Sequence, residues 1–150
     1  DLGWRISYER LRDYLLREAG KDTKIYVYKG IDPKNQGQRR FLDMLDMLGF
    51  KVTTKPVKKI RLPNGRVKWK NNLDVDLAID LVEDLPECDN VVLFSGDSDF
   101  VPALKRVRDQ KKNMLVFSAR GRTSREISDF SEYIYIGDIR NEIEMTDNKK

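Results

Sequence analysis

The acidic turn at residues 95–99 holds the side chains best suited to chemistry. It follows an apolar segment predicted as a buried strand over 90–95, and it opens a helix predicted over 98–110. Ligand sites of α/β proteins lie at such carboxyl ends of strands. Asp97 and Asp99 offer the carboxylate oxygens that a hard cation such as Mg²⁺ prefers. The alternative is structural, with Asp97 or Ser98 capping the helix that follows.

A second candidate, Asp74, lies at the start of a helix predicted over 73–85. This helix carries one broad apolar arc, and Asp74 projects from within that arc. An inward-facing carboxylate costs free energy unless it is paired, caps the helix or binds a metal. Residues 71–104 contain no Lys, Arg or His, so a metal is the more economical counter-charge. The other acids of the helix, including Asp76 and Asp80, are predicted on its outer face.

The residue inventory excludes several classes of enzyme. The chain has no histidine, so a Ser-His-Asp triad, a Cys-His dyad and a His-ligated zinc site are impossible. Its single cysteine, Cys88, cannot form an internal disulfide, which suits a reducing compartment. The apolar runs are shorter than the roughly 18–20 residues that span a bilayer, and no signal-peptide pattern opens the chain. We therefore expect a cytoplasmic protein without a membrane partner, whose catalysis depends on carboxylates, lysines, hydroxyls or a hard metal ion.

The formal charge of +4 hides three blocks of alternating sign. Residues 51–70 hold eight bases and no acid, residues 71–104 hold nine acids and no base, and residues 105–125 hold eight bases and one acid. A single charged run is usually a solvated face. Three consecutive blocks indicate instead a basic surface around an acidic pocket, which a metal-dependent enzyme acting on a polyanion needs.

Helical and strand-like segments alternate along all 150 residues, which predicts one α/β domain. This alternation implies a Rossmann-like three-layer sandwich with a mostly parallel sheet. Ser7 and Gly20 mark the ends of the first helix. A basic β-hairpin insertion is predicted at about 57–70, with a type I′ turn at Asn64-Gly65. The predicted helices are 7–19, 37–48, 73–85, 98–110 and 123–130, and the predicted strands are 24–28, 50–54, 90–95, 113–118 and 133–136.

The basic hairpin is predicted to bind a nucleic-acid backbone. Its basic residues alternate with apolar ones, and Trp69 is available to stack on a base. The alternative is a solubilised edge hairpin with Trp69 packed on the domain. A second loop would bind phosphate through Arg120, Arg122 and the backbone amides before the helix at 123–130, unless it is an unordered surface loop. The hairpin candidates are Lys58, Arg61, Arg66, Lys68, Trp69 and Lys70.

Two motifs in the acidic block carry a family resemblance. They are Leu73-Asp74-Val75-Asp76-Leu77-Ala78-Ile79-Asp80 and, about twenty residues later, Ser95-Gly96-Asp97-Ser98-Asp99-Phe100. Together they resemble the NYN domain of the LabA-like (DUF88) family, a branch of the PIN-like nucleases. The resemblance covers nearly the whole chain and implies a Rossmann-like fold whose clustered aspartates bind Mg²⁺ or Mn²⁺ and cleave RNA. It also implies that the family's first strand, which supplies a metal ligand, is missing from this chain.

The resemblance implies a ribonuclease, and we expect its partner to be single-stranded RNA. Its implied catalytic residues and metal ligands are Asp74, Asp97 and Asp99. Supporting positions around them are expected at Asp76, Asp80, Ser95 and Ser98. A homodimer is left open. The alternative is a non-catalytic α/β module of the same fold that binds nucleic acid or a protein.

Overall fold

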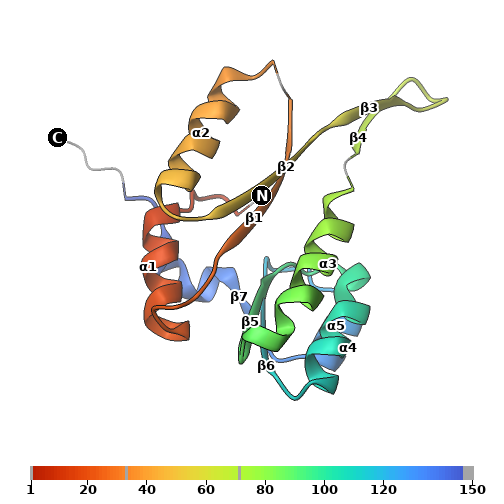
Figure 1. Cartoon of the computed structure of the whole chain (residues 1–150). Helices are drawn as coiled ribbons and strands as arrows, with labels where there is room; N and C mark the ends of the chain where they lie inside the picture. The colour runs from red at the N-terminus through yellow and green to blue at the C-terminus, as the bar shows by residue number, and fades with distance from the viewer. Residues whose placement is uncertain (1, 33, 71, 147–150) are drawn as a thin grey trace. The chain divides into compact units, whose positions relative to one another are not determined.

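The computed structural model describes residues 2–32, 34–70 and 72–146, apart from the side chains of Lys68 and Trp69. Residue contacts divide the chain into two compact units: unit 1 holds Asp1–Thr23 and Ala78–Lys150, and unit 2 holds Lys24–Leu77. Parallel strands flanked by helices occur in each unit (Figure 1), which confirms the α/β fold class. One domain over the whole chain stays a prediction.

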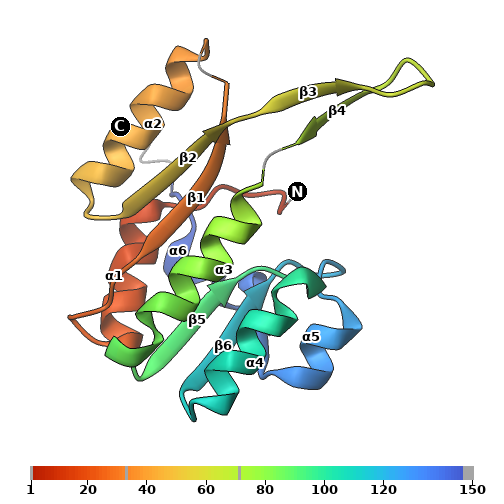
Figure 2. The ribbon, with the colours of Figure 1, turned by 45° about the vertical axis from the view of Figure 1, so that its right-hand side comes forward.

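Unit 1 is built on a three-stranded parallel sheet in the order β5 (Asn90–Phe94), β6 (Asn113–Ser118) and β7 (Tyr133–Tyr135). The central strand β6 is the most buried of the three, as expected for a strand covered on both faces. Helices α4 (Val101–Asp109) and α5 (Arg125–Phe130) lie beside the sheet, as Figure 2 shows. The fully buried side chains of this layer include Leu104, Val107, Val116 and Ile127.

The two ends of the described chain also pack together in unit 1. Helix α1 (Tyr8–Ala19) begins at Ser7, whose Oγ accepts a hydrogen bond from the Arg10 N–H, and it ends before Gly20. Helix α6 (Arg140–Ile143) and the 3₁₀ helix η3 (Ile136–Ile139) pack on each other, and α6 packs on α1. The first helix is thus confirmed. Helix α6 was not predicted because four residues are too few to show the periodic spacing of apolar side chains that indicates a helix.

Unit 2 contains a βαβ arrangement. Strand β1 (Tyr26–Ile31) pairs in parallel with β2 (Lys51–Pro56), and helix α2 (Gln36–Met47) connects them. The Asn35 side chain caps α2, and Leu45 is buried. Both strands extend further toward their carboxyl ends than predicted, since the ladder continues through positions that lack a β-rich composition.

The basic hairpin of unit 2 is formed by β3 (Lys58–Arg61) and β4 (Val67–Lys70), and β3 continues the ribbon of β2 (Figure 2). The hairpin is confirmed, but its type I′ turn is wrong. Gly65 N–H donates to the Leu62 carbonyl (3.0 Å), and Gly65 alone in the turn has a positive φ, +77°. This is the three-residue loop of a type I turn with a glycine bulge. Pro63 explains it, because its fixed φ suits the second position of a type I turn.

Helix α3 (Leu73–Asp84) and the short 3₁₀ helix η1 (Leu85–Glu87) lead from the hairpin toward β5. Leu73 and Leu85, at the two ends of this segment, are buried. Among the described helices, none combines the length and the apolar character that crossing a membrane requires.

Candidate active site

The turn after β5 is held by its own side chains. The Asp97 N–H donates to Ser95 Oγ (3.2 Å), and Asp97 Oδ1 accepts from the Asp99 N–H (3.0 Å). Asp97 is thereby the N-cap of the 3₁₀ helix η2 (Ser98–Phe100), so the capping role considered for it is confirmed. Phe100 is buried and anchors the turn, whereas Asp97 and Asp99 are exposed. Two carboxylates therefore face solvent at the carboxyl end of β5.

Gly96 allows a second loop to lie directly against this turn. A Cβ at Gly96 would lie 2.0 Å from the Arg122 carbonyl oxygen and 2.9 Å from Thr123 Cα, so no side chain fits there. The Ser124 N–H donates to the Gly96 carbonyl (2.9 Å). Glycine is required for this close approach of two backbones. The carboxylate turn and the loop after β6 consequently form one edge of unit 1.

The loop after β6 is held by hydrogen bonds of its backbone and side chains. The Arg122 N–H donates to the Ala119 carbonyl (3.0 Å) and closes a turn. The hydroxyls of Ser118, which is buried, and Thr123 hydrogen-bond to each other. Ser124 caps α5 through its side chain. No sequence pattern signals the Ser118–Thr123 pair, because it depends on how the chain returns after β6.

Arg120 and Arg122 are both exposed in this loop. The Arg120 guanidinium lies 5.6 Å from the centroid of the Tyr135 ring, within cation–π range. It borders a cavity of about 330 Å³ at the carboxyl ends of β6 and β7, to which Trp4 and Asp138 also contribute. The two predicted phosphate-binding arginines thus follow β6, and the acidic turn follows the neighbouring strand β5.

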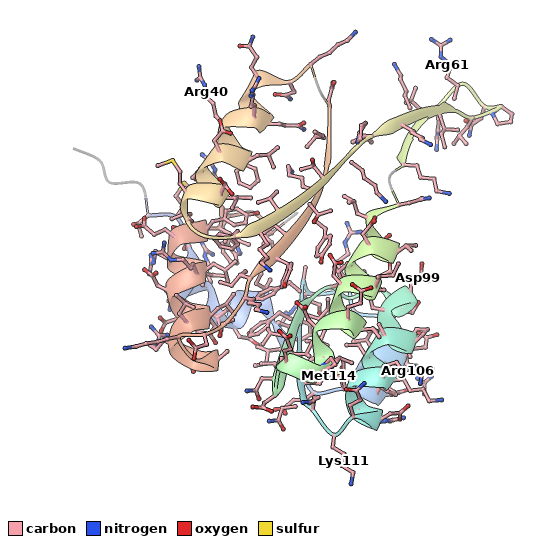
Figure 3. All side chains as sticks on the ribbon, in the orientation of Figure 1. Arg40, Arg61, Asp99, Arg106, Lys111 and Met114 are labelled. Atoms are coloured by element: carbon pink, nitrogen blue, oxygen red, sulfur yellow. The ribbon has the colours of Figure 1, made fainter. Side chains whose placement is uncertain are left out.

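The third charge block does not form one continuous surface. Figure 3 shows Asp99 beside the start of α4, whereas Arg106 and Lys111 lie toward its other end. The basic residues that the backbone brings to the acidic turn are those after β6, Arg120 and Arg122. Of the basic residues in the third block, only Arg120 and Arg122 therefore form the basic surface predicted beside the acidic turn.

Asp74 does not face inward as predicted. It is exposed, and so are Val75 and Ile79 of the predicted apolar arc, at 60% and 50% of their surface. The apolar arc of α3 is therefore only partly covered. Asp74 lies in unit 2, whereas Asp97 and Asp99 lie in unit 1, and its role as a third metal ligand stays a prediction.

Asp76 is not on an outer face as predicted, because its side chain is 32% exposed and forms an ion pair with Lys55 of β2. The positive charge that pairs with α3 therefore comes from a strand that is distant in sequence. The lack of bases over 71–104 gave no sign of this pair. Asp80, also predicted on the outer face, is half-buried. The acidic side of α3 is thus partly covered.

The acidic turn fits a hard cation in its ligand chemistry. Mg²⁺ commonly keeps several waters and binds only one or two carboxylates. The capping bond uses Oδ1 of Asp97, which leaves its Oδ2 and the Asp99 carboxylate for a cation. Within the described part of the chain, no group of three or more acidic or cysteine side chains is close enough to hold a metal.

The hairpin candidates lie on two faces rather than in one groove. The cross-strand register pairs Lys58 with Lys70 and Arg61 with Val67. Because successive residues of a strand point to opposite faces, Arg61 lies on the face opposite Lys58 and Lys70. All three are exposed. The remaining hairpin candidates are Arg66, which is exposed, and Lys68 and Trp69, whose side chains lie outside the described part.

Known proteins are similar to this chain in sequence and in fold. The NYN domain family matches residues 1–137. The chain is 35% identical over 150 residues to "Low amplitude and bright protein LabA" of Synechococcus elongatus (strain ATCC 33912 / PCC 7942 / FACHB-805), and the match covers 97% of this chain and 80% of that protein. A crystal structure of a protein of unknown function from Vibrio parahaemolyticus RIMD 2210633 superposes with a TM-score of 0.72 at 25% identity, over 95% of this chain and 84% of the other. The chain therefore belongs to the NYN domain family and is LabA-like within it.

Proposed function

We propose that this NYN domain hydrolyses phosphodiester bonds of RNA in a metal-dependent reaction, with Asp97 and Asp99 as its central carboxylates. The observation that carries the proposal is the edge at which the acidic turn and the arginine loop meet backbone to backbone at Gly96. Carboxylates for a cation beside cationic side chains suit a phosphodiester, on which negative charge develops during hydrolysis. The family supports a nucleic-acid substrate.

The side chains at this edge have different tasks. Asp97 and Asp99 would hold Mg²⁺ or Mn²⁺, and water would complete the coordination of the ion. The capping bond of Asp97 fixes its carboxylate before substrate arrives, so less conformational entropy is lost on binding. Arg120 and Arg122 bind phosphate oxygens through charge-assisted hydrogen bonds. When bound, the metal supplies an activated water and positive charge at the phosphate.

The test is cleavage of a 5′-labelled single-stranded RNA in Mn²⁺ or Mg²⁺, with EDTA as the metal-free reference. Asp97→Asn and Asp99→Asn should each lower the rate by roughly a hundredfold or more, as expected when one charged group at the reacting phosphate is removed. Asp109→Asn is the matched control, because Asp109 is an exposed carboxylate at the far end of α4. Cleavage by Asp97→Asn at the wild-type rate would overturn the site, and absence of cleavage by the wild type with both metals would overturn the function.

A second candidate function is a non-catalytic module that binds nucleic acid without cleaving it. The observation that favours it is that Asp97 already has a structural task as the cap of η2. In that case Asp97→Asn, whose amide oxygen still caps η2, leaves stability, RNA affinity and the RNA itself unchanged. Intact RNA after incubation of the wild type with either metal, together with measurable binding, would establish this alternative.

A further inference from the structure

We infer that a lysine-lined hollow at the base of the β3–β4 hairpin binds one phosphodiester of the RNA strand. The hollow has a volume of about 460 Å³ and is lined by Lys55, Pro56, Lys58, Lys70 and Asn72. All five residues belong to unit 2. This volume lies within the range of roughly 300–1,000 Å³ that small-ligand sites occupy, so it suits one nucleotide unit of a chain. The inference rests on the proposed function, since it takes RNA as the substrate.

The described side chains of the hairpin contribute little to the core of their unit. All four residues of β3 are exposed, and Ile60 and Val67 each expose about two fifths of their surface. A two-stranded hairpin whose side chains are not buried is marginally stable in water. The exposure of β3 is therefore better explained by a ligand that it binds than by packing.

The charges at the base of the hairpin are unbalanced. Lys58 and Lys70 lie directly opposite each other in the antiparallel register. Like charges at opposed positions destabilise a strand pair. Lys55 is compensated by its ion pair with Asp76, whereas neither Lys58 nor Lys70 has an ion-pair partner in the described residues. An anion between the two ammonium groups would remove their repulsion, so the hollow carries two positive charges ready for a ligand.

The chemistry of the hollow favours a phosphodiester over other anions. Lysine acts on phosphate as a point charge with three donors, and Asn72 can add an amide donor. The methylene stems of the lysines and Pro56 supply apolar surface for a ribose. A membrane surface is flat and cannot enter a hollow of this size, and the acid-free run over 51–70 continues the positive charge along the hairpin, as a polyanionic strand requires.

The test measures RNA binding without cleavage. The full chain is titrated into a 5′-fluorescein-labelled 12-nucleotide oligouridylate in EDTA, and anisotropy is followed between 50 and 300 mM KCl. The Lys58→Ala/Lys70→Ala variant should raise Kd about tenfold at the lowest salt and lower the slope of log K against log salt by about 0.7, as expected for one lost phosphate contact on a single strand. Circular dichroism should match the wild type, and the melting temperature should be equal or slightly higher, because the variant removes the repulsion between the two ammonium groups.

The matched control is Lys34→Ala/Lys59→Ala, which removes the same charge from unit 2. Lys59 neighbours Lys58 on the opposite face of β3, and Lys34 is exposed before α2. This control should raise Kd less than threefold. An equal loss of RNA affinity in both variants would overturn the phosphodiester site and show that RNA responds to diffuse positive charge. If Lys58→Ala/Lys70→Ala binds RNA like the wild type but no longer binds phosphatidylserine vesicles, the hollow binds a membrane and the inference is overturned.

The outcomes also separate this inference from the proposed function. If the wild type cleaves RNA and Lys58→Ala/Lys70→Ala cleaves it with an unchanged KM, the phosphodiester site in the hollow is overturned and the proposed function stands. If the hollow variant loses RNA binding as expected while the wild type leaves RNA intact in Mn²⁺ and Mg²⁺, the hollow stands and the function is overturned.

Discussion

Gly96 and Arg122 touch backbone to backbone, since a Cβ on Gly96 would lie 2.0 Å from the carbonyl oxygen of Arg122 and 2.7 Å from its carbonyl carbon. The hydrogen bond from Ser124 to Gly96 fixes this contact. The loops after two neighbouring strands therefore behave as one structural piece. Through this piece, the position of Asp97 depends on the chain segment that carries Arg120 and Arg122.

Gly96→Ala should therefore lower both stability and activity. Added volume at a closely packed position costs about 1–3 kcal/mol, and here the obstacle is backbone, which cannot rotate away. Urea denaturation measures the free energy of unfolding. Gly137→Ala is the control, because a Cβ there meets nothing within 4 Å, and its effect should stay within about 0.5 kcal/mol. Equal unfolding midpoints for the two variants would show that the loops do not meet as described.

The ion pair between Lys55 and Asp76 should stabilise unit 2 only slightly. The two side chains are 43% and 32% exposed, so water and salt screen their attraction. A double-mutant cycle with Lys55→Met and Asp76→Asn should give a coupling energy of about 0.5–1 kcal/mol in low salt, and less in 1 M NaCl. A coupling energy that does not respond to salt would mean that the pair acts through packing.

Local signals in the sequence predicted the elements that depend on local chemistry. Ser7 and Gly20 marked the ends of α1 because caps act within a single turn. The acidic turn was placed correctly after β5 because an apolar run followed by glycine and aspartate is a local pattern. The α/β class followed from the alternation of such segments.

Features that depend on distant parts of the chain were not predictable in this way. The inward position predicted for Asp74 is wrong because Asp74 is exposed, and the width of an apolar arc does not say which part of it is covered. Lys55 forms an ion pair with Asp76, 21 positions later in the chain, and no local sequence pattern predicts this pair. The tight contact at Gly96 likewise depends on the return of the chain after β6. Even the hairpin turn was decided by Pro63, one position before the Asn-Gly pair that suggested a different turn.

Acid should destabilise the chain partly through Glu144. Two hydrogen bonds from the Arg140 guanidinium, 2.8 and 2.7 Å long, hold the pKa of the Glu144 carboxyl below its ordinary value. A carboxyl whose pKa is lowered in the folded state adds stability above its unfolded pKa, about 4.3, and loses that contribution as pH falls through the folded value. Glu144→Gln should therefore be less stable than the wild type at pH 7 and should approach it below pH 4.

Unfolding midpoints in urea between pH 3 and pH 7 measure this effect. Glu126→Gln is the control, because Glu126 is exposed on α5 and makes no ion pair with the described residues. The difference between the wild type and Glu144→Gln should shrink steadily as pH falls. A difference that stays constant from pH 7 to pH 3 would contradict a role for the ionised carboxylate.

The two tasks of Asp97 can be separated by substitution. Serine keeps an oxygen that caps η2 but removes the carboxylate, whereas alanine removes both. Asp97→Ala should lose about 1 kcal/mol of stability without metal, and Asp97→Ser should lose much less. If Asp97 also binds a cation, Mn²⁺ at about a hundred times its Kd should stabilise the wild type by about 2.7 kcal/mol and neither variant. Melting temperatures with Mn²⁺ and with EDTA measure both effects, and an equal rise for the wild type and Asp97→Ser would mean that the cation binds elsewhere.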